Sequence, residues 1–580
     1  MHNVLNLPAR LGPTSTRAYR ALISHNRASA GRFSIPRRYL STGSGAPEDV
    51  AIIGGGITGL ACAYYVTKHY PAAKITLYEK SPRFGGWLLS ERIPVDDEGG
   101  TVLFEAGPRS LRPLGNGALA LSMLVDLDLL KDTIWTSKSS PAATSRYIYY
   151  PDHLVRLLAP PAPGWVAKSW KTMLSEPLFE GFLPALATEA FRGSRHEDLS
   201  DESVAQFISR RMGPNVANRV LSAVFHGIYA GDVNKLSAKS LLKRLWQIEG
   251  EYGSFMASAL VGPFRRPKIP PKRELAFMEA LTDLPVPPQH LADQIKMSSV
   301  YTFRNGLGQF TDSLVGYLWD RPKTNFQHGT TVQSLEHKAD GTLDITINKN
   351  NGTTKRSHTH AIWTAVPGSL TQTASVTEGI KQDLEGIPFE TVMTVNLYYK
   401  SPDLHPPGFG YLIPLATPIE QNPENALGVV FDNSYAPDPA FDDDDIRGPA
   451  QDTVKQRGTK LTVMLGGHYW SSWPSYPSEE EGLAMAKSIL KRHLNISEEP
   501  AASRVNLNTN CIPQYTVGHE RRLNSIHDGL VKQYGGTLRV AGSWINGVGV
   551  NDCLRSAWNT VSDLQHGQRS GLESIVHPEG

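Results

Sequence analysis

Cysteine is scarce in this chain of 580 residues, which has only Cys62, Cys511 and Cys553. The three lie far apart, and no two of them form a C-x-x-C pair. The sequence therefore contains neither a disulfide framework nor the ligand spacing of a zinc site. We predict no metal centre.

Long apolar runs and a strong charge of either sign are also missing. No stretch of about 18 uncharged apolar residues occurs, so we predict no transmembrane helix. The formal net charge is +2 and no sustained basic stripe is present, so we predict no nucleic-acid binding. Attachment to a membrane surface through an amphipathic helix stays open.

Acidic residues and lysine are absent from residues 1–47, which carry seven arginines and many Ser, Thr and Ala residues. This composition is typical of a mitochondrial transit peptide, and a basic tail without a targeting role is the alternative. Without these seven charges, the formal net charge of +2 becomes −5.

Glycine is abundant where residues 51–60 read Ala-Ile-Ile-Gly-Gly-Gly-Ile-Thr-Gly-Leu. An apolar strand meets a Gly-x-Gly-x-x-Gly turn at Gly54, Gly56 and Gly59, and an apolar helix pattern follows. This order predicts a dinucleotide-binding βαβ unit. The first glycine permits the tight turn, the second lets a pyrophosphate approach the backbone, and the third lets helix and strand pack closely.

A second strand is predicted over residues 74–78, and it ends at Glu79. A carboxylate there would accept hydrogen bonds from a ribose 2′-hydroxyl and repel a 2′-phosphate. A glycine-rich turn without a ligand is the alternative. The order of strand, glycines, helix, strand and acid favours the dinucleotide.

Two later segments favour FAD over NAD. Gly85 and Gly86 follow Glu79 closely, in an Arg-x-Gly-Gly context that resembles the second signature of the flavin amine oxidase superfamily. Residues 540–553 read Val-Ala-Gly-Ser-Trp-Ile-Asn-Gly-Val-Gly-Val-Asn-Asp-Cys, whose small residues would let a flavin or its phosphates approach a helix start. Asp552 in this segment is open to a simpler interpretation, as an acid at a helix N-terminus.

The strand pattern continues beyond the glycine segments. Residues 330–335, 343–347 and 361–365 are expected to return to the nucleotide-domain sheet. Residues 392–399, 411–414, 428–431 and 461–465 are expected to form a second, largely antiparallel sheet. Helices are predicted over 204–212 and 479–494, and Ser237 is a candidate N-cap. We interpret the Pro-rich stretch 262–288 as a surface insertion or linker.

Three blocks carry a closer resemblance. Residues 104–113, 510–519 and 547–553 resemble the oxygen-dependent, mitochondrial protoporphyrinogen oxidases, and residues 407–410 and 463–467 fit as well. The resemblance extends from about residue 48 to 570. The basic N-terminus, the stretch 262–288 and the acidic stretch 436–458 depart from it and look like insertions.

This resemblance implies an α/β fold with three parts: a discontinuous Rossmann-like FAD domain, a substrate domain with an antiparallel sheet, and a helical region that touches the membrane. We assign 48–140, 301–370 and 501–580 to the FAD domain. The substrate domain takes 141–151, 246–300 and 371–500, and the helical membrane-associating region takes 152–245.

The implied reaction is the six-electron oxidation of protoporphyrinogen IX to protoporphyrin IX, with O2 as acceptor and H2O2 as product. It is the penultimate step of haem synthesis, and it places the protein peripherally on the mitochondrial inner membrane. We assign no catalytic side chain, because N5 of the flavin can accept the hydride while pyrrole protons go to solvent. A homodimer and a contact with ferrochelatase are left open.

The resemblance also implies the site residues. Arg146 would pair with a substrate propionate, Gly227 would abut the macrocycle, and Phe409 and Leu412 would form apolar walls. A surface arginine, a helix break and ordinary core packing are the respective alternatives. His226 lies next to Gly227 with no partner evident in the sequence, and we interpret it as non-catalytic. The expected FAD contacts are Gly54, Gly55, Gly56, Ile57, Thr58, Gly59, Glu79, Gly85, Gly86, Trp87, Gly107, Pro108, Arg109, Ser110, Val332, Gly542, Val548, Gly549 and Val550.

Arg109 has two further interpretations: a second candidate for the propionate, or one member of a structural ion pair. For the whole chain, the alternatives are a flavin amine oxidase, a phytoene-desaturase-like enzyme, or a flavin-binding regulatory protein without turnover. The glycine segments do not separate the three enzymes, whereas blocks 104–113 and 510–519 favour the porphyrinogen oxidases by resemblance. The presence of both Arg146 and Gly227 argues against a regulatory protein without turnover.

Overall fold

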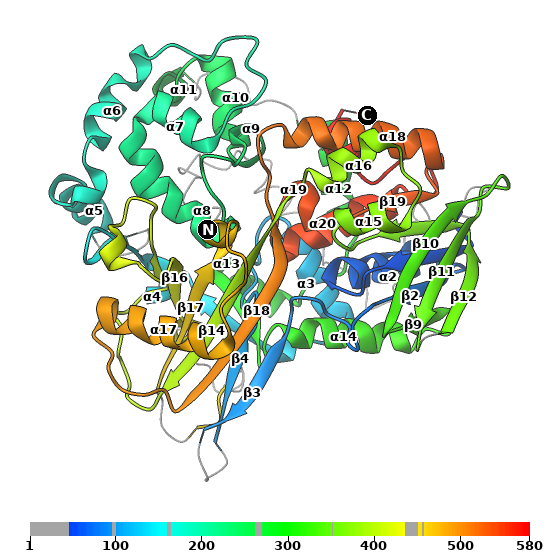
Figure 1. Cartoon of the computed structure of the whole chain (residues 1–580), viewed down its shortest axis with the longest axis horizontal. Helices are drawn as coiled ribbons and strands as arrows, with labels where there is room; N and C mark the ends of the chain where they lie inside the picture. Colours follow the sequence, from blue (N-terminus) through cyan, green and yellow to red (C-terminus); the bar gives the residue numbers. More distant parts are fainter. Residues whose placement is uncertain are drawn as a thin grey trace.

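A parallel sheet of five strands forms the centre of one half of the molecule (Figure 1). The computed structural model describes residues 46–95, 100–158, 164–261, 270–350, 352–435, 451–454 and 458–579. The strand order is β19–β13–β1–β2–β9, and every neighbouring pair is parallel. The strands are β1 (Asp49–Ile53), β2 (Lys74–Tyr78), β9 (Thr324–Gln327), β13 (His360–Trp363) and β19 (Leu538–Val540).

Both faces of this sheet are buried, as a parallel sheet requires. Val50 and Ile52 of β1 face one apolar cluster, whereas Ala51 and Ile53 face another. The first cluster is covered by α2 (Ile57–His69), α3 (Gly117–Asp126), α14 (Gly308–Trp319) and α20 (Val550–Ser562). The second is covered by α15 (Pro367–Thr373), α16 (Glu378–Glu385) and α18 (His519–Tyr534).

The expectation that residues 330–335 and 343–347 join this sheet is wrong. They lie in a separate antiparallel sheet of β10 (Thr330–His337), β11 (Leu343–Lys349) and β12 (Gly352–His358). In β11 the buried residues Leu343, Ile345 and Ile347 alternate with less buried polar ones. That pattern suits an antiparallel sheet with one buried face rather than a parallel strand with two.

The second large sheet has seven strands in the order β18–β14–β17–β16–β15–β6–β7, with α17 (Glu479–Leu494) packed on it. We assigned 501–580 to the FAD domain, but β18 pairs along β14, with Val395 opposite Val505. The domain boundary therefore lies after β18. The strands are β6 (Ser145–Tyr149), β7 (Leu154–Leu158), β14 (Phe389–Tyr399), β15 (Gly410–Leu412), β16 (Ala426–Phe431), β17 (Thr459–Gly466) and β18 (Ala502–Pro513).

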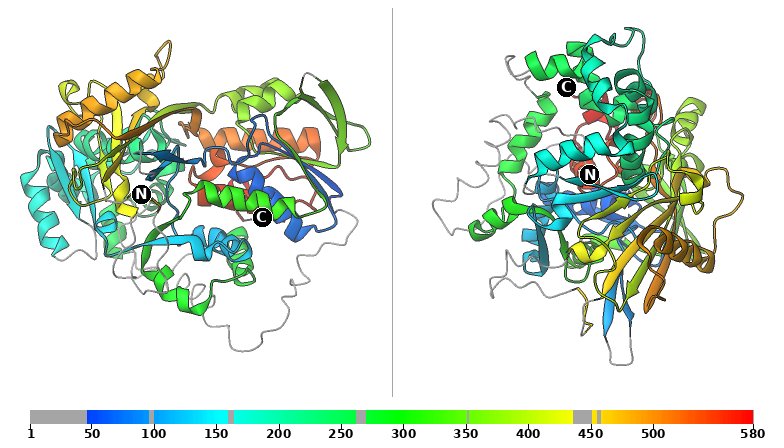
Figure 2. Two further views of the ribbon diagram at one scale, coloured as in Figure 1. Left: turned by 90° about the horizontal axis from the view of Figure 1, so that it is seen from below. Right: turned by 90° about the vertical axis from the view of Figure 1, so that its left-hand side faces the viewer.

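A helical region occupies one end of the molecule (Figures 1 and 2). Ser203 caps α7 in a capping box with Gln206, and Ser237 caps α9 by accepting a hydrogen bond from the Ser240 N–H. The region continues past residue 245 because Trp246 and Phe255 pack in its core. Its helices are α5 (Trp165–Ser175), α6 (Phe182–Thr188), α7 (Val204–Met212), α8 (Ser222–Tyr229), α9 (Ala238–Leu241), α10 (Lys243–Tyr252) and α11 (Phe255–Val261).

Two short pairs of antiparallel strands lie outside the five-stranded and seven-stranded sheets. One is the hairpin of β3 (Ser90–Pro94) and β4 (Thr101–Glu105), which leads into the predicted FAD segment 107–110. The other pairs β5 (Thr133–Ser137) with β8 (Ser298–Phe303).

The stretch 246–300 also departs from its assignment to the substrate domain. Helices α12 (Lys272–Thr282) and α13 (Gln289–Met297) pack on the nucleotide core, where the Phe277 and Trp558 rings lie 4.9 Å apart. The described part of 262–288 is therefore more than a surface insertion. Residues 1–45, 262–269 and most of 436–458 lie outside the described residues. Within the described parts of the chain, no helix is long and apolar enough to cross a membrane.

Candidate functional site

The glycine turn lies where β1 ends and α2 begins. The Gly54 N–H donates to the Tyr78 carbonyl at the end of β2 (2.9 Å). A Cβ at Gly59 would lie 1.9 Å from the Gly54 oxygen, so the third glycine is required for helix and strand to pack. A Cβ at Gly56 would come no closer than 3.8 Å, to Gly86 Cα. The protein leaves room beside Gly56.

Glu79 follows β2 and turns back towards this loop. One carboxylate oxygen accepts from the Gly55 N–H (2.7 Å), and the other accepts from the backbone and hydroxyl of Ser81 (2.8 and 2.7 Å). Val332 lies nearby at the start of β10, in the buried cluster that contains Ile53. Glu79 is thus fixed at the carboxyl ends of the parallel strands, where nucleotides bind in such sheets.

The second glycine pair packs directly on the first loop. The Gly85 N–H donates to the Gly55 oxygen (2.8 Å), and a Cβ at Gly86 would lie 3.0 Å from Gly56 Cα. Both glycines have positive φ, +111° and +59°. Trp87 follows with 43% of its surface exposed, and a Cβ at Gly107 would lie 2.5 Å from the Trp87 oxygen. Four parts of the predicted FAD site therefore meet at this turn: residues 54–59, Glu79, residues 85–87 and Gly107.

The C-terminal segment brings a second helix start to the same place. Helices α2 and α20 pack side by side in the first apolar cluster, where Leu60 of α2 and Leu554 of α20 are both fully buried. Their N-caps are Gly56 and Gly549, and neither helix start has a side-chain cap apart from the long contact of Asp552 with the Gly549 N–H (3.3 Å). Val548 and Val550 flank this cap. Uncapped N–H groups and the helix dipoles suit a bound anion.

Asp552 fits the simpler interpretation that we gave it. It lies in the first turn of α20, where one oxygen faces the Gly549 N–H and the other accepts from the Asn116 amide (3.0 Å). A Cβ at Gly547 would lie 2.5 Å from the Asp552 carboxylate carbon. Asp552 therefore shapes the loop that precedes α20. Gly542 starts this segment at φ +151°, and its N–H donates to Ser556 (3.0 Å).

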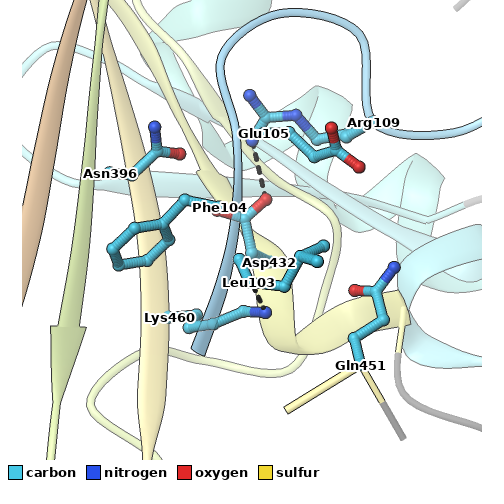
Figure 3. Close-up of a pocket in the computed structure, with 8 residues that line it drawn as sticks. All are labelled: Leu103, Phe104, Glu105, Arg109, Asn396, Asp432, Gln451 and Lys460. Atoms are coloured by element: carbon cyan, nitrogen blue, oxygen red, sulfur yellow. Dashed lines mark hydrogen bonds and ion pairs between the residues drawn. The ribbon is translucent and has the colours of Figure 1, made fainter. Parts of the chain in front are cut away.

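Arg109 forms an ion pair with Asp432, with 2.6 Å between Nη1 and Oδ1, and both side chains are largely buried. This is the structural interpretation weighed above. The pair lines a cavity of about 10 Å³, drawn in Figure 3, between segment 103–109 and the seven-stranded sheet. The Ala106 oxygen accepts from Thr394 (2.8 Å) and Asn508 (3.0 Å) of that sheet. The predicted FAD segment containing Gly107, Pro108 and Ser110 is thus attached to the seven-stranded sheet.

Glu105 was not singled out from the sequence. Burial raises its pKa to about 7, although hydrogen bonds from Ser90 and the Leu307 N–H oppose that rise. The Ser90 hydroxyl donates to one oxygen (2.6 Å) and the Leu307 N–H to the other (2.8 Å). Because both oxygens are engaged, we interpret Glu105 as holding the segment that leads to Arg109.

The four predicted substrate residues come from three neighbouring elements. Arg146 on β6 is half-buried, donates to the Ala143 oxygen (3.1 Å), and places its guanidinium carbon 5.8 Å from the centre of the Phe409 ring. Leu412 on β15 packs in a buried cluster with Ala223 of α8. Gly227 lies one helical turn after Ala223, so both are on the same face of α8. The structure places Arg146 beside Phe409 and Leu412 against α8, the helix that carries Gly227, and the roles of all four stay predictions.

His226 does have a partner, contrary to what the sequence indicated. It is buried, and its Nε2 lies 2.9 Å from Nε2 of His468. Its Nδ1 lies 2.7 Å from the Ile413 oxygen. No sequence signal pointed to this pair, because 242 positions separate the two histidines.

Comparison with known proteins identifies the fold and the cofactor class. The sequence profile of the flavin containing amine oxidoreductases matches residues 57–565. The chain belongs to this family. FAD is accordingly its cofactor. The glycine turn, the second glycine pair, Glu79 and the two helix starts described above agree with this.

The similarity to relatives and to solved structures covers almost the whole chain. The chain is 35% identical to the protoporphyrinogen oxidase of Schizosaccharomyces pombe, over 89% of this chain and 98% of that protein. It is 30% identical to the protoporphyrinogen oxidase of Homo sapiens, over 87% and 96%. A crystal structure from Exiguobacterium assigned to the protoporphyrinogen oxidases shares the fold, with a TM-score of 0.64, 18% identity and coverage of 91% and 99%.

Substitution of Gly56 by valine should empty the FAD site of a folded protein. The protein itself leaves space for a Cβ at this position, so the added methyl groups project into the space for the pyrophosphate. We expect Gly56→Val to purify as a soluble, cooperatively unfolding protein with little or no bound flavin, as measured by absorbance near 450 nm. Gly59→Ala is the contrast, because its Cβ would overlap the Gly54 oxygen and should destabilise the fold itself. A fully yellow Gly56→Val protein would contradict the pyrophosphate assignment.

Proposed function

We propose that this flavin-dependent oxidoreductase oxidises protoporphyrinogen IX to protoporphyrin IX with O2 as acceptor. The observation that carries the proposal is the similarity, over nearly their full length, to relatives named protoporphyrinogen oxidase. Six electrons and six protons leave the macrocycle, and three molecules of O2 take them up as three molecules of H2O2. When bound at the glycine turn, FAD would supply the two-electron redox chemistry that this oxidation needs.

The arrangement of β6, β15 and α8 supports a porphyrinogen as substrate. The molecule is a flexible, largely apolar macrocycle with two propionates. Arg146 offers a guanidinium for one carboxylate beside the Phe409 ring. Phe409 and Leu412 supply apolar surface that excludes water, and Gly227 lets the ring approach the backbone of α8. The task of these residues is to hold and orient the substrate.

The proposal is tested with purified, FAD-loaded protein mixed with protoporphyrinogen IX in air. We expect porphyrin fluorescence to rise together with H2O2, at three molecules of peroxide per porphyrin, and well above the rate with heat-denatured protein. A primary amine and coproporphyrinogen III, which carries four propionates, are the comparison substrates. Faster oxidation of the amine would favour an amine oxidase, and faster oxidation of coproporphyrinogen would reassign the substrate.

Replacing Arg146 by alanine should weaken substrate binding without releasing FAD. Loss of a charge-assisted hydrogen bond costs about 1.5–3 kcal/mol, so KM for protoporphyrinogen should rise roughly ten- to a hundredfold. Flavin content should be unchanged. Arg156→Ala is the matched control, because Arg156 lies on the adjacent strand, is exposed and hydrogen-bonds Ser145. An equal loss of flavin in Arg146→Ala, or an equal rise of KM in both variants, would refute the role.

We also propose that the helical region binds the surface of the mitochondrial inner membrane. No residue of α5 is buried, and Val166, Trp170 and Leu174 are 50%, 50% and 72% exposed. Their spacing of four places them on one face of the helix, while Lys168 and Lys171 are exposed beside them. An apolar face flanked by lysines suits an anionic lipid surface. The arginine-rich composition of residues 1–47 supports a mitochondrial location.

The double variant Trp170→Glu/Leu174→Glu should bind membranes more weakly. Burial of each such side chain contributes about 1.5–3 kcal/mol, so partition into vesicles of phosphatidylcholine and cardiolipin should fall at least tenfold in a flotation assay. The expected activity in detergent is unchanged. Leu275→Glu is the control and should float normally, because Leu275 is 42% exposed on α12, a helix that packs on the nucleotide core through Phe277 and Ala280. Equal flotation of both variants would contradict the role of α5.

A further inference from the structure

A pair of histidines lies directly behind the predicted substrate wall. His226 on α8 precedes Gly227, and its side chain is 1% exposed. The ring of His468 stacks on it with centroids 4.9 Å apart. His468 belongs to the short 3-10 helix Gly467–Trp470, which follows β17. The pair therefore joins α8 to the end of a strand in the substrate sheet.

The hydrogen bonds fix one proton position on each ring. The Ile413 carbonyl can only accept, so Nδ1 of His226 donates to it (2.7 Å). Nε2 of neutral His226 is then an acceptor, and Nε2 of His468 donates to it (2.9 Å). Burial keeps both rings neutral by lowering the pKa of His226 to about 3 and that of His468 to about 4, with Asp232 and Lys235 exerting opposite effects on His468.

Backbone contacts hold the same two elements together. The His468 N–H donates to the Ala230 oxygen just after α8 (2.8 Å). A Cβ at Gly467 would lie 2.3 Å from that oxygen, and Gly467 has φ +61°. The 3-10 helix thus lies directly against the end of α8, where His468 is in place to meet His226.

The hydrogen-bond chain from His468 through His226 ends next to β15, the strand that carries the predicted wall residue Leu412. Ile413 follows Leu412, whose side chain packs with Ala223 of α8. His226 therefore fastens α8 to this strand from one side, while Leu412 and Ala223 make contact one turn earlier. The hydrogen bond from His226 to Ile413 is therefore one of the contacts that hold α8, and with it Gly227, against this strand.

We propose that His226 and His468 are positioning residues, which set the distance between Gly227 on α8 and Leu412 on β15. This distance determines how well the macrocycle fits between them. The inference rests on the proposed function. The pair touches neither substrate nor flavin in this scheme. Its effect is therefore on substrate affinity rather than on the rate of electron transfer.

The test compares His468→Leu, His226→Asn and the double variant in the FAD-loaded enzyme. Leucine removes the donor to His226, and asparagine keeps a donor for Ile413 but is too short to reach His468. We expect KM for protoporphyrinogen to rise about three- to tenfold in each single variant, with kcat within about twofold and flavin content unchanged. Because the two act as a unit, the double variant should show no larger KM than the single ones.

His468→Gln keeps an N–H near the position of Nε2 and should restore KM to within about twofold of the original. A purely structural role would lower the melting temperature of the variants while leaving KM unchanged, and would overturn the inference. Effects that multiply in the double variant would also overturn it. If the unsubstituted enzyme oxidises no porphyrinogen, the proposed function fails and this inference fails with it. If the enzyme is active but the variants have unchanged KM values, the positioning role of the two histidines is rejected while the proposed function stands.

Discussion

The contact between the glycine turn and the Gly85–Gly86 segment is the constraint on which the cofactor site depends. The Gly85 N–H donates to the Gly55 oxygen, and the two backbones approach so closely at Gly56 and Gly86 that a Cβ at Gly86 would reach van der Waals overlap. Glu79 is fastened to the same turn by the Gly55 N–H. The loop, the acid and the start of α2 are therefore one rigid assembly, which presents uncapped N–H groups towards the space beside Gly56.

The substrate half is attached to this assembly through a few polar contacts. The Ala106 carbonyl accepts from Thr394 and Asn508, and Arg109 pairs with Asp432. These contacts cross from the predicted flavin segment to the seven-stranded sheet. The same sheet continues through β15 and β6 to Leu412 and Arg146. One sheet and a buried ion pair thus connect the predicted flavin segment to the strands that carry the predicted substrate residues.

Local sequence signals predicted single elements well where one helix or strand carries its own pattern. Residues 74–78, 204–212 and 479–494 form the expected strand and helices, and Ser237 is an N-cap. The assignment of elements to sheets was less successful. Residues 330–337 and 343–349 lie in a separate antiparallel sheet, β18 belongs to the seven-stranded sheet, and α12 and α13 pack on the nucleotide core. Periodicity states which face of an element is buried, but not against what.

The sequence by itself determined the dinucleotide turn, the acid after the second strand, and the resemblance that led to a flavin. These depend on residues close together in the chain, where glycine conformation and strand–turn–helix order are local properties. Only the tertiary structure decided that Arg109 is paired with Asp432, that Arg146 lies beside Phe409, and that His226 meets His468. Each of these contacts joins elements distant in sequence. The packing of whole sheets and helices brings them together, and no short motif encodes that packing.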